Sequence, residues 1–136
     1  MSVPVLTWSL SQVELGQRVA IATVISAKGS VPGKPGARLA ITSDNQHFGT
    51  VGGAGLELRI QNNLKKLLNK DPKLNRKEGG ILETFHLYKD AKGKEVTALD
   101  SLCGGQVTVS MEVIEPMPHI LIAGGGHVGR CVALVA

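Results

Sequence analysis

The feature that most constrains the fold is an apolar run that leads directly into a glycine turn. Residues 119–129 read HILIAGGGHVG, with Gly124, Gly126 and Gly129 at G-x-G-x-x-G spacing. This pattern is typical of the first strand, turn and helix of a dinucleotide-binding βαβ unit, whose helix N-terminus faces a phosphate. The acidic residue that holds the ribose is expected about 20 residues further on, yet the sequence ends at Ala136. We therefore expect only the start of such a domain, without NAD(P) binding, and a function that resides upstream.

Composition narrows the class of protein. Of the 136 residues, 43% are hydrophobic and 19% are charged, which is typical of a soluble globular protein. The 17 glycines exceed the usual share of about 7%, and their clustering favours tight turns or a ligand close to the backbone. Aromatic residues make up only 3%, so base-stacking surfaces for nucleic acid are scarce. The net charge of +4 suits a small anionic ligand or an acidic partner, and the basic stretch 65–77 is interpreted as a solvated face.

The sequence also indicates a compartment. The N-terminus lacks the basic flank and long apolar region of a secretory leader, and the apolar tail is interrupted by glycines, His127 and Arg130, unlike a membrane span. We expect a cytoplasmic, reduced protein with Cys103 and Cys131 as free thiols. Neither H-E-x-x-H nor C-x-x-C spacing occurs, so no zinc site is expected.

The hydrophobic pattern predicts an α/β fold, in the form of a mixed α+β sheet with covering helices. Two helices are expected, one over 4–16 and one after the glycines at 52–55, in which Leu56, Ile60, Leu64 and Leu67 share a face. Strands are expected at 18–26, 38–42, 47–51, 81–88 and 106–114 and from 119 onward, with 38–42 and 47–51 as a hairpin. Either face of 81–88 could point to the core.

A proline pair, Pro116 and Pro118, marks the best domain boundary. It separates a domain at 1–115 from the truncated start of a Rossmann-like domain at 119–136. Without the rest of its sheet, this tail would leave apolar side chains in water, so we expect it to pack on the first domain or to pair with a second copy in a homo-oligomer.

Two glycine-rich stretches are candidate ligand sites. In GTVGGAGLE, 49–57, a strand ends in glycines and a helix follows, so free N–H groups favour an anion, although the same pattern fits a plain tight turn. Glu57 is favourable in the first helical turn even without a ligand. In GSVPGKPGAR, 29–38, Ser30, Lys34 and Arg38 place a hydroxyl and two cations in one restricted loop, which suits either an oxyanion or a rigid surface turn. If 38–42 and 47–51 pair as a hairpin, this loop would lie near the glycines at 52–55.

Several stretches together resemble one family. ATVISAKGSVPGKPGARLAITSDN, FGTVGGAGLEL and LCGGQVTVSMEVIEP, in this order, are similar to the XdhC/CoxI family, and HILIAGGGHVGR resembles the start of that family's Rossmann domain. The resemblance runs from about Arg18 to the end of the chain, with little motif around 69–78. Members are accessory (chaperone) proteins for molybdenum hydroxylases such as xanthine dehydrogenase and carbon monoxide dehydrogenase. The resemblance implies binding of the molybdenum cofactor, its maturation and its insertion into the apo-enzyme, rather than enzymatic turnover.

The resemblance also implies partners and site residues. The partners would be a molybdenum hydroxylase apo-enzyme and a cysteine desulfurase. Because the pterin cofactor carries a phosphate, the glycine turn at 52–55 is the first choice for its contact. The full set of candidate cofactor-binding residues is Ser30, Lys34, Arg38, Gly52, Gly53, Gly55, Glu57, Cys103, Gly104, Gly105, Gly124, Gly126, His127 and Gly129.

The sequence departs from the family at one chemical position. Many members carry a cysteine where Gly55 stands, which leaves Cys103 as the candidate thiol and possible molybdenum ligand. Cys103 could equally be a buried small hydrophobe, and only its thiolate would be a ligand. Two alternative functions remain: a truncated nucleotide-dependent oxidoreductase, and a domain that docks on the hydroxylase without holding cofactor.

Overall fold

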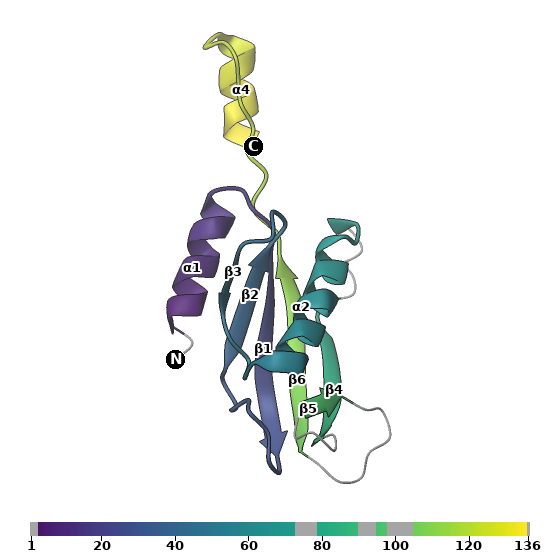
Figure 1. The fold of residues 1–136 in the computed structure, drawn as a ribbon. Helices are drawn as coiled ribbons and strands as arrows, with labels where there is room; N and C mark the ends of the chain where they lie inside the picture. Colours follow the sequence, from purple (N-terminus) through teal and green to yellow (C-terminus); the bar gives the residue numbers. More distant parts are fainter. Residues whose placement is uncertain (1–2, 73–78, 90–94, 98–104, 136) are drawn as a thin grey trace.

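A computed structural model describes residues 3–72, 79–89, 95–97 and 105–135, and these residues form a six-stranded sheet with a helix on each face (Figure 1). Along the sheet the strands lie in the order β3-β2-β1-β6-β4-β5, and every neighbouring pair is antiparallel. The elements are α1 (Val3–Glu14), β1 (Val19–Lys28), β2 (Arg38–Thr42), β3 (His47–Gly49), α2 (Ala54–Leu68), β4 (Ile81–Lys89), β5 (Glu95–Thr97), β6 (Gln106–Ile114) and α4 (His127–Val135). The predicted sheet with covering helices is confirmed.

The central pair, β1 and β6, defines the two ends of the sheet. Val19 pairs with Ile114 at one end and Lys28 pairs with Gln106 at the other, with a register shift between Val24 and Ser26. The loop that follows β1 therefore lies at the same end as Gly105, which precedes β6. The chain that follows β6 leaves from the opposite end.

Helix α2 covers one face of the sheet and forms the main core. Leu56, Ile60, Leu64 and Leu67 are all buried, as their helical spacing predicts. They pack over alternate residues of β1, β6 and β4. The structure also settles the face of β4 that the sequence left open, because Phe85 and Leu87 are in this core while Leu82 is 67% exposed.

Helix α1 covers part of the other face. Its Val5 packs with Val19, Ile21 and Ala40 in a second, smaller cluster. Trp8 stacks on Phe48 of β3, with ring centroids 5.8 Å apart. The start of α1 is thereby fixed beside the β2–β3 hairpin, at the end of the sheet where the glycine loops lie (Figure 1).

The predicted strand from residue 119 is wrong. Residues 115–125 form no strand, because a strand needs hydrogen-bonding neighbours and none of the six strands lies beside this segment. Leu121 is 94% exposed and α4 has no buried residue, so the expected packing of the tail on the first domain is also wrong. Figure 1 shows α4 standing apart from the sheet. Pairing of the tail with a second copy stays a prediction.

Candidate functional site

Three glycine-rich segments meet at one end of the sheet: the β1–β2 loop at 29–37, the turn between β3 and α2, and Gly105 just before β6. A Cβ atom on Gly52 would lie 2.6 Å from the nitrogen of Gly33, and a Cβ on Gly33 would lie 2.5 Å from the carbonyl oxygen of Val51. A Cβ on Gly105 would lie 2.7 Å from the carbonyl oxygen of Ser30. Glycine is required at these positions because backbone meets backbone there.

The β1–β2 loop folds back on the strand that precedes it. The N–H of Gly36 donates to the carbonyl of Val24 at 2.8 Å, and the N–H of Val24 donates to the carbonyl of Ala37 at 2.9 Å. These bonds hold the loop against β1 next to Val24 and Ser26, where the register of the strand shifts. They bring Lys34 and Arg38 to the same side as Gly52, as the sequence predicted for a hairpin of β2 and β3.

A cavity of about 690 Å³ opens between this loop, the hairpin and the first residues of α1. Its wall includes the predicted Lys34, Arg38 and Gly52. Lys34 is exposed and Arg38 is half-buried, and neither has an ion pair within the described part of the chain. The remaining wall is formed by Pro4, Val5, Pro32, Gly33, Pro35, Gly36, Ala37, Phe48, Gly49 and Thr50. The cavity thus combines two available cations with apolar ring and proline surfaces.

Glu57 already occupies the N–H groups of the turn that the sequence assigned to a phosphate. One oxygen of its carboxylate accepts from the N–H of Val51 at 3.3 Å, from the N–H of Gly53 at 3.2 Å and from the hydroxyl of Thr50. The N–H of Gly52 donates to the Thr50 hydroxyl at 3.2 Å. A carboxylate near a helix N-terminus is favoured by the same positive end that attracts an anionic ligand, so Glu57 occupies two N–H groups of the turn before α2 within the chain itself.

Three other predicted residues lie in the glycine-rich segments at the same end of the sheet as the cavity. Ser30 is exposed in the β1–β2 loop, Gly55 lies in the first turn of α2, and Gly105 is buried beside Val31. Cys103 and Gly104 lie outside the described residues. The cofactor roles of all these residues, and that of Cys103 as a molybdenum ligand, stay predictions.

The tail keeps the local geometry of a dinucleotide-binding turn without its sheet. Gly124 has φ +112°, and a Cβ on Gly129 would lie 2.5 Å from the Gly124 carbonyl oxygen. The helix that follows begins at His127, which is exposed, with its Nε2 3.8 Å from the sulfur of Cys131. This turn and Gly126 leave from the end of the sheet opposite to the cavity (Figure 1). The structure therefore does not bring the two predicted groups of glycines together.

Sequence reasoning missed the contribution of α1 and β3 to the cavity. Pro4, Val5 and Phe48 line it; Phe48 opens the stretch FGTVGGAGLEL, whereas no motif marks Pro4 and Val5. The sequence offered one indirect signal for this contribution. Trp8 and Phe48 are two of its few aromatic residues, and they lie on α1 and β3, the elements that flank the β1–β2 loop.

The described residues contain no group of three or more His, Cys, Asp or Glu side chains that could hold a metal ion. In the same part of the chain, none of the helices is both long and apolar enough to cross a membrane.

The class of fold is shared with a solved structure. A chain described as a xanthine dehydrogenase from Bacillus halodurans superposes with a TM-score of 0.53 and 20% sequence identity, over 79% of this chain and 30% of that chain. At this identity the likeness establishes the fold alone.

The sequence comparison is more specific. Residues 12–76 match the XdhC and CoxI family, which is the family that the motifs of the sequence resemble. The matched segment contains the β1–β2 loop, the turn before α2 and Glu57. A curated relative, the uncharacterized protein YqeB of Escherichia coli K12, is 29% identical over 115 residues, which are 84% of this chain and 19% of that protein. The chain thus spans about a fifth of that relative's length.

Proposed function

We propose that this chain is a cofactor-binding domain of an accessory protein for a molybdenum hydroxylase of the xanthine dehydrogenase type. The family match supports the accessory role. The cavity beside Lys34 and Arg38 is the single observation that carries the cofactor part of the proposal. Handover of a bound group, rather than turnover, is the role that we assign to it.

The residues that line the cavity fit the molybdenum cofactor in two respects. Its phosphate is an anion, and Arg38 can bind a phosphate in a bidentate manner while Lys34 supplies a compact charge. Its pterin is a flat ring system, and Phe48, Pro35 and Pro4 offer apolar surface for such a ring. The volume of about 690 Å³ lies within the usual range of about 300 to 1,000 Å³ for ligand pockets. The cofactor itself would supply the molybdenum that the hydroxylase needs.

We place the phosphate beside Lys34 and Arg38, and not at the glycine turn at 52–55 that the sequence favoured. Because Glu57 takes the N–H groups of Val51 and Gly53, we assign the phosphate to Lys34 of the β1–β2 loop and Arg38 at the start of β2. Gly52 and Gly33 then serve to close the cavity wall, since they allow the two loops to touch.

Several finer features of the proposal rest on the resemblance alone. They are delivery to a hydroxylase apo-enzyme, a cysteine desulfurase as second partner, Cys103 as the molybdenum ligand and a cytoplasmic location. A homo-oligomer formed through the exposed tail belongs to the same group of proposals.

The test is an anaerobic titration of the molybdenum cofactor into the folded chain. We expect Lys34→Ala/Arg38→Ala to weaken binding at least about tenfold, since charge-assisted hydrogen bonds contribute about 1.5–3 kcal/mol each. The charge-matched control is Lys65→Ala/Arg130→Ala, which removes two exposed cations away from the cavity. Equal affinity in all three proteins would contradict the assignment. Binding to the hydroxylase that survives the Lys34/Arg38 substitutions, without cofactor binding, would favour the docking domain instead.

A further inference from the structure

A second groove, of about 380 Å³, lies between α2 and β4. Four of the residues that line it come from α2, namely Arg59, Asn63, Lys66 and Leu67, and Lys70 follows just after the end of that helix. Arg59, Asn63 and Lys66 are spaced four and three residues apart, which places them along one face of the helix. This groove shares no lining residue with the cavity beside Lys34 and Arg38, so it is a separate feature of the molecule.

Two contacts across the groove fix how the helix lies against the strand. The guanidinium of Arg59 lies 5.9 Å from the centroid of the Phe85 ring. One step further along, the side-chain amide of Asn63 donates to the carboxylate of Glu83 at 2.8 Å. The later residues of α2 thus face the earlier residues of β4, and Arg59 and Lys66 stand on either side of the Asn63–Glu83 bond.

Two of the cations along the groove, Arg59 and Lys66, have no carboxylate partner in the described part of the chain. Glu83 is the acidic residue in the lining, and its carboxylate is bonded to Asn63. Cations therefore outnumber acids along the groove, which favours a negatively charged occupant.

Among the described residues, part of the edge of β4 beside these cations has no strand partner. β4 pairs with β6 from Ile81 to His86, whereas β5 pairs with β4 only from Leu87 to Lys89. Within the described ranges, the outer edge of β4 from Ile81 to His86 has no strand partner. Ile81 is 39% exposed and Leu82 is 67% exposed there. Unpaired backbone groups at an edge accept an added strand.

We infer that this groove binds an acidic, extended segment of a partner protein, which adds as a strand to the free edge of β4. Its carboxylates would face Arg59 and Lys66, and its apolar side chains would contact Ile81. From Arg59 to Leu68, where α2 ends, the helix rises about 14 Å at 1.5 Å per residue. At about 3.3 Å per extended residue, the groove accepts a segment of about four residues. The inference does not depend on the cofactor cavity.

The test measures fluorescence anisotropy of a labelled hexapeptide of alternating glutamate and valine, titrated with the chain at low salt. We expect saturable binding that is at least about tenfold weaker in Arg59→Gln/Lys66→Gln. The charge-matched control, Lys65→Gln/Arg130→Gln, should bind as the wild type does, because neither residue lines the groove. Lys66→Glu alone is a second variant. Because Lys66 is exposed, this variant reverses one charge of the groove and leaves the contact between Arg59 and Phe85 in place.

Amide hydrogen exchange at 81–86 distinguishes strand addition from charge attraction alone, and should slow when the peptide is bound. The inference is overturned if the wild type does not bind the peptide, if the Arg59/Lys66 variants bind it equally well, or if a lysine–valine peptide binds as tightly. Unchanged exchange along β4 would overturn the strand addition.

Discussion

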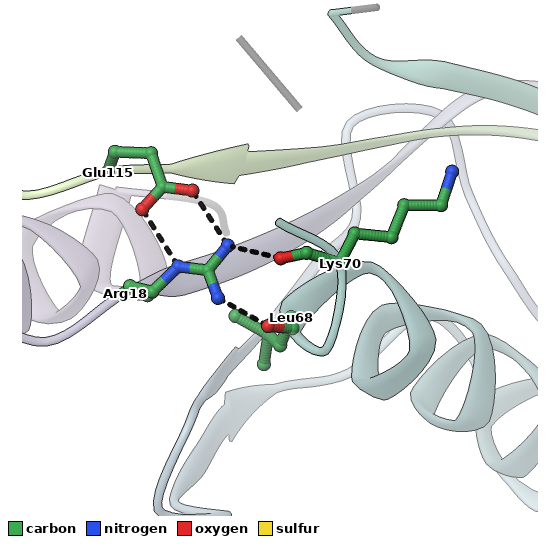
Figure 2. Close-up of polar contacts among 4 residues, drawn as sticks. All are labelled: Arg18, Leu68, Lys70 and Glu115. Carbon is green, nitrogen blue, oxygen red and sulfur yellow. Dashed lines mark hydrogen bonds and ion pairs between the residues drawn. The ribbon is translucent and has the colours of Figure 1, made fainter. Parts of the chain in front are cut away.

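Arg18 and Glu115, 97 residues apart in the sequence, form a two-point ion pair (Figure 2). The Nε and Nη2 atoms of Arg18 each donate to a different carboxylate oxygen of Glu115 at 2.8 Å. The same guanidinium donates to the backbone carbonyls of Leu68 and Lys70, at the end of α2. Because the last carbonyls of a helix lack partners within it, a cation there stabilises the helix end. One side chain thus joins the start of β1, the chain after β6 and α2.

Arg18→Ala should lower the free energy of unfolding by about 2–3 kcal/mol, because it leaves a largely buried carboxylate and two carbonyls without their donor. The relevant exposures are 21% for the Arg18 side chain and 11% for that of Glu115. Urea denaturation measures the change. Glu112→Gln is the control, since Glu112 is exposed on the neighbouring strand and its substitution should cost less than about 0.5 kcal/mol. An equal effect of the two substitutions would contradict the role of this pair.

Gly33→Ala and Gly105→Ala should each destabilise the fold by about 2 kcal/mol, within the range for overpacked sites. The added Cβ would meet the Val51 carbonyl oxygen at 2.5 Å in the first case and the Ser30 carbonyl oxygen at 2.7 Å in the second. Thermal unfolding measures both. Gly125→Ala is the matched control, because nothing lies within 4 Å of its Cβ position. If all three variants melted together, the close contact of the loops would be refuted.

Five of the six strands could be predicted within about two residues because their apolar runs and alternation record which side is buried. The sequence-based prediction missed β5 (Glu95–Thr97), which is only three residues long. β2 and β6 have the predicted bounds, while β1 continues to Lys28 and β3 ends at Gly49, where φ is +89°. The prediction of a strand from residue 119 was wrong because this segment has no neighbouring strand among the described residues. Its apolar run has the composition of a strand, but a strand forms only where neighbours satisfy its backbone. In β4, both faces carry apolar residues, Ile81 on one and Leu82 on the other. The sequence alone therefore could not show which face is buried, and packing against α2 determines it.

The candidate site could be predicted in part. The sequence placed Lys34 and Arg38 in one loop and proposed that this loop lies near Gly52, and the structure brings all three to one cavity. The sequence could not show that Glu57 bonds to the turn before its own helix. Nor could it show that Phe48 closes the wall. Both contacts depend on where separate elements meet in space.

Stability in acid should depend on Asp44. A hydrogen bond from the Thr42 hydroxyl, together with bonds from Gln46, lowers the pKa of Asp44 below its ordinary value of 3.8. Because the folded state favours the carboxylate, this stabilisation is present above the ordinary pKa and is lost as the pH falls through the lowered value. Asp44→Asn should therefore reduce the loss of stability between about pH 5 and about pH 2, as measured by urea denaturation at several pH values. Glu14→Gln serves as an exposed control, and identical acid profiles for wild type and Asp44→Asn would contradict the prediction.

Trp8, the single tryptophan of the sequence, should report on ligands in the cavity. It stacks on Phe48 at 5.8 Å with an angle of 17° between the rings, and Phe48 lines the cavity beside Lys34 and Arg38. A pterin that contacts Phe48 should shift or quench the Trp8 emission in proportion to occupancy. Phe48→Leu should cost about 1 kcal/mol of stability through the lost aromatic pair and should reduce the emission response, while Lys34 and Arg38 still bind the phosphate. Cofactor binding without any change in Trp8 emission would place the ring elsewhere in the molecule.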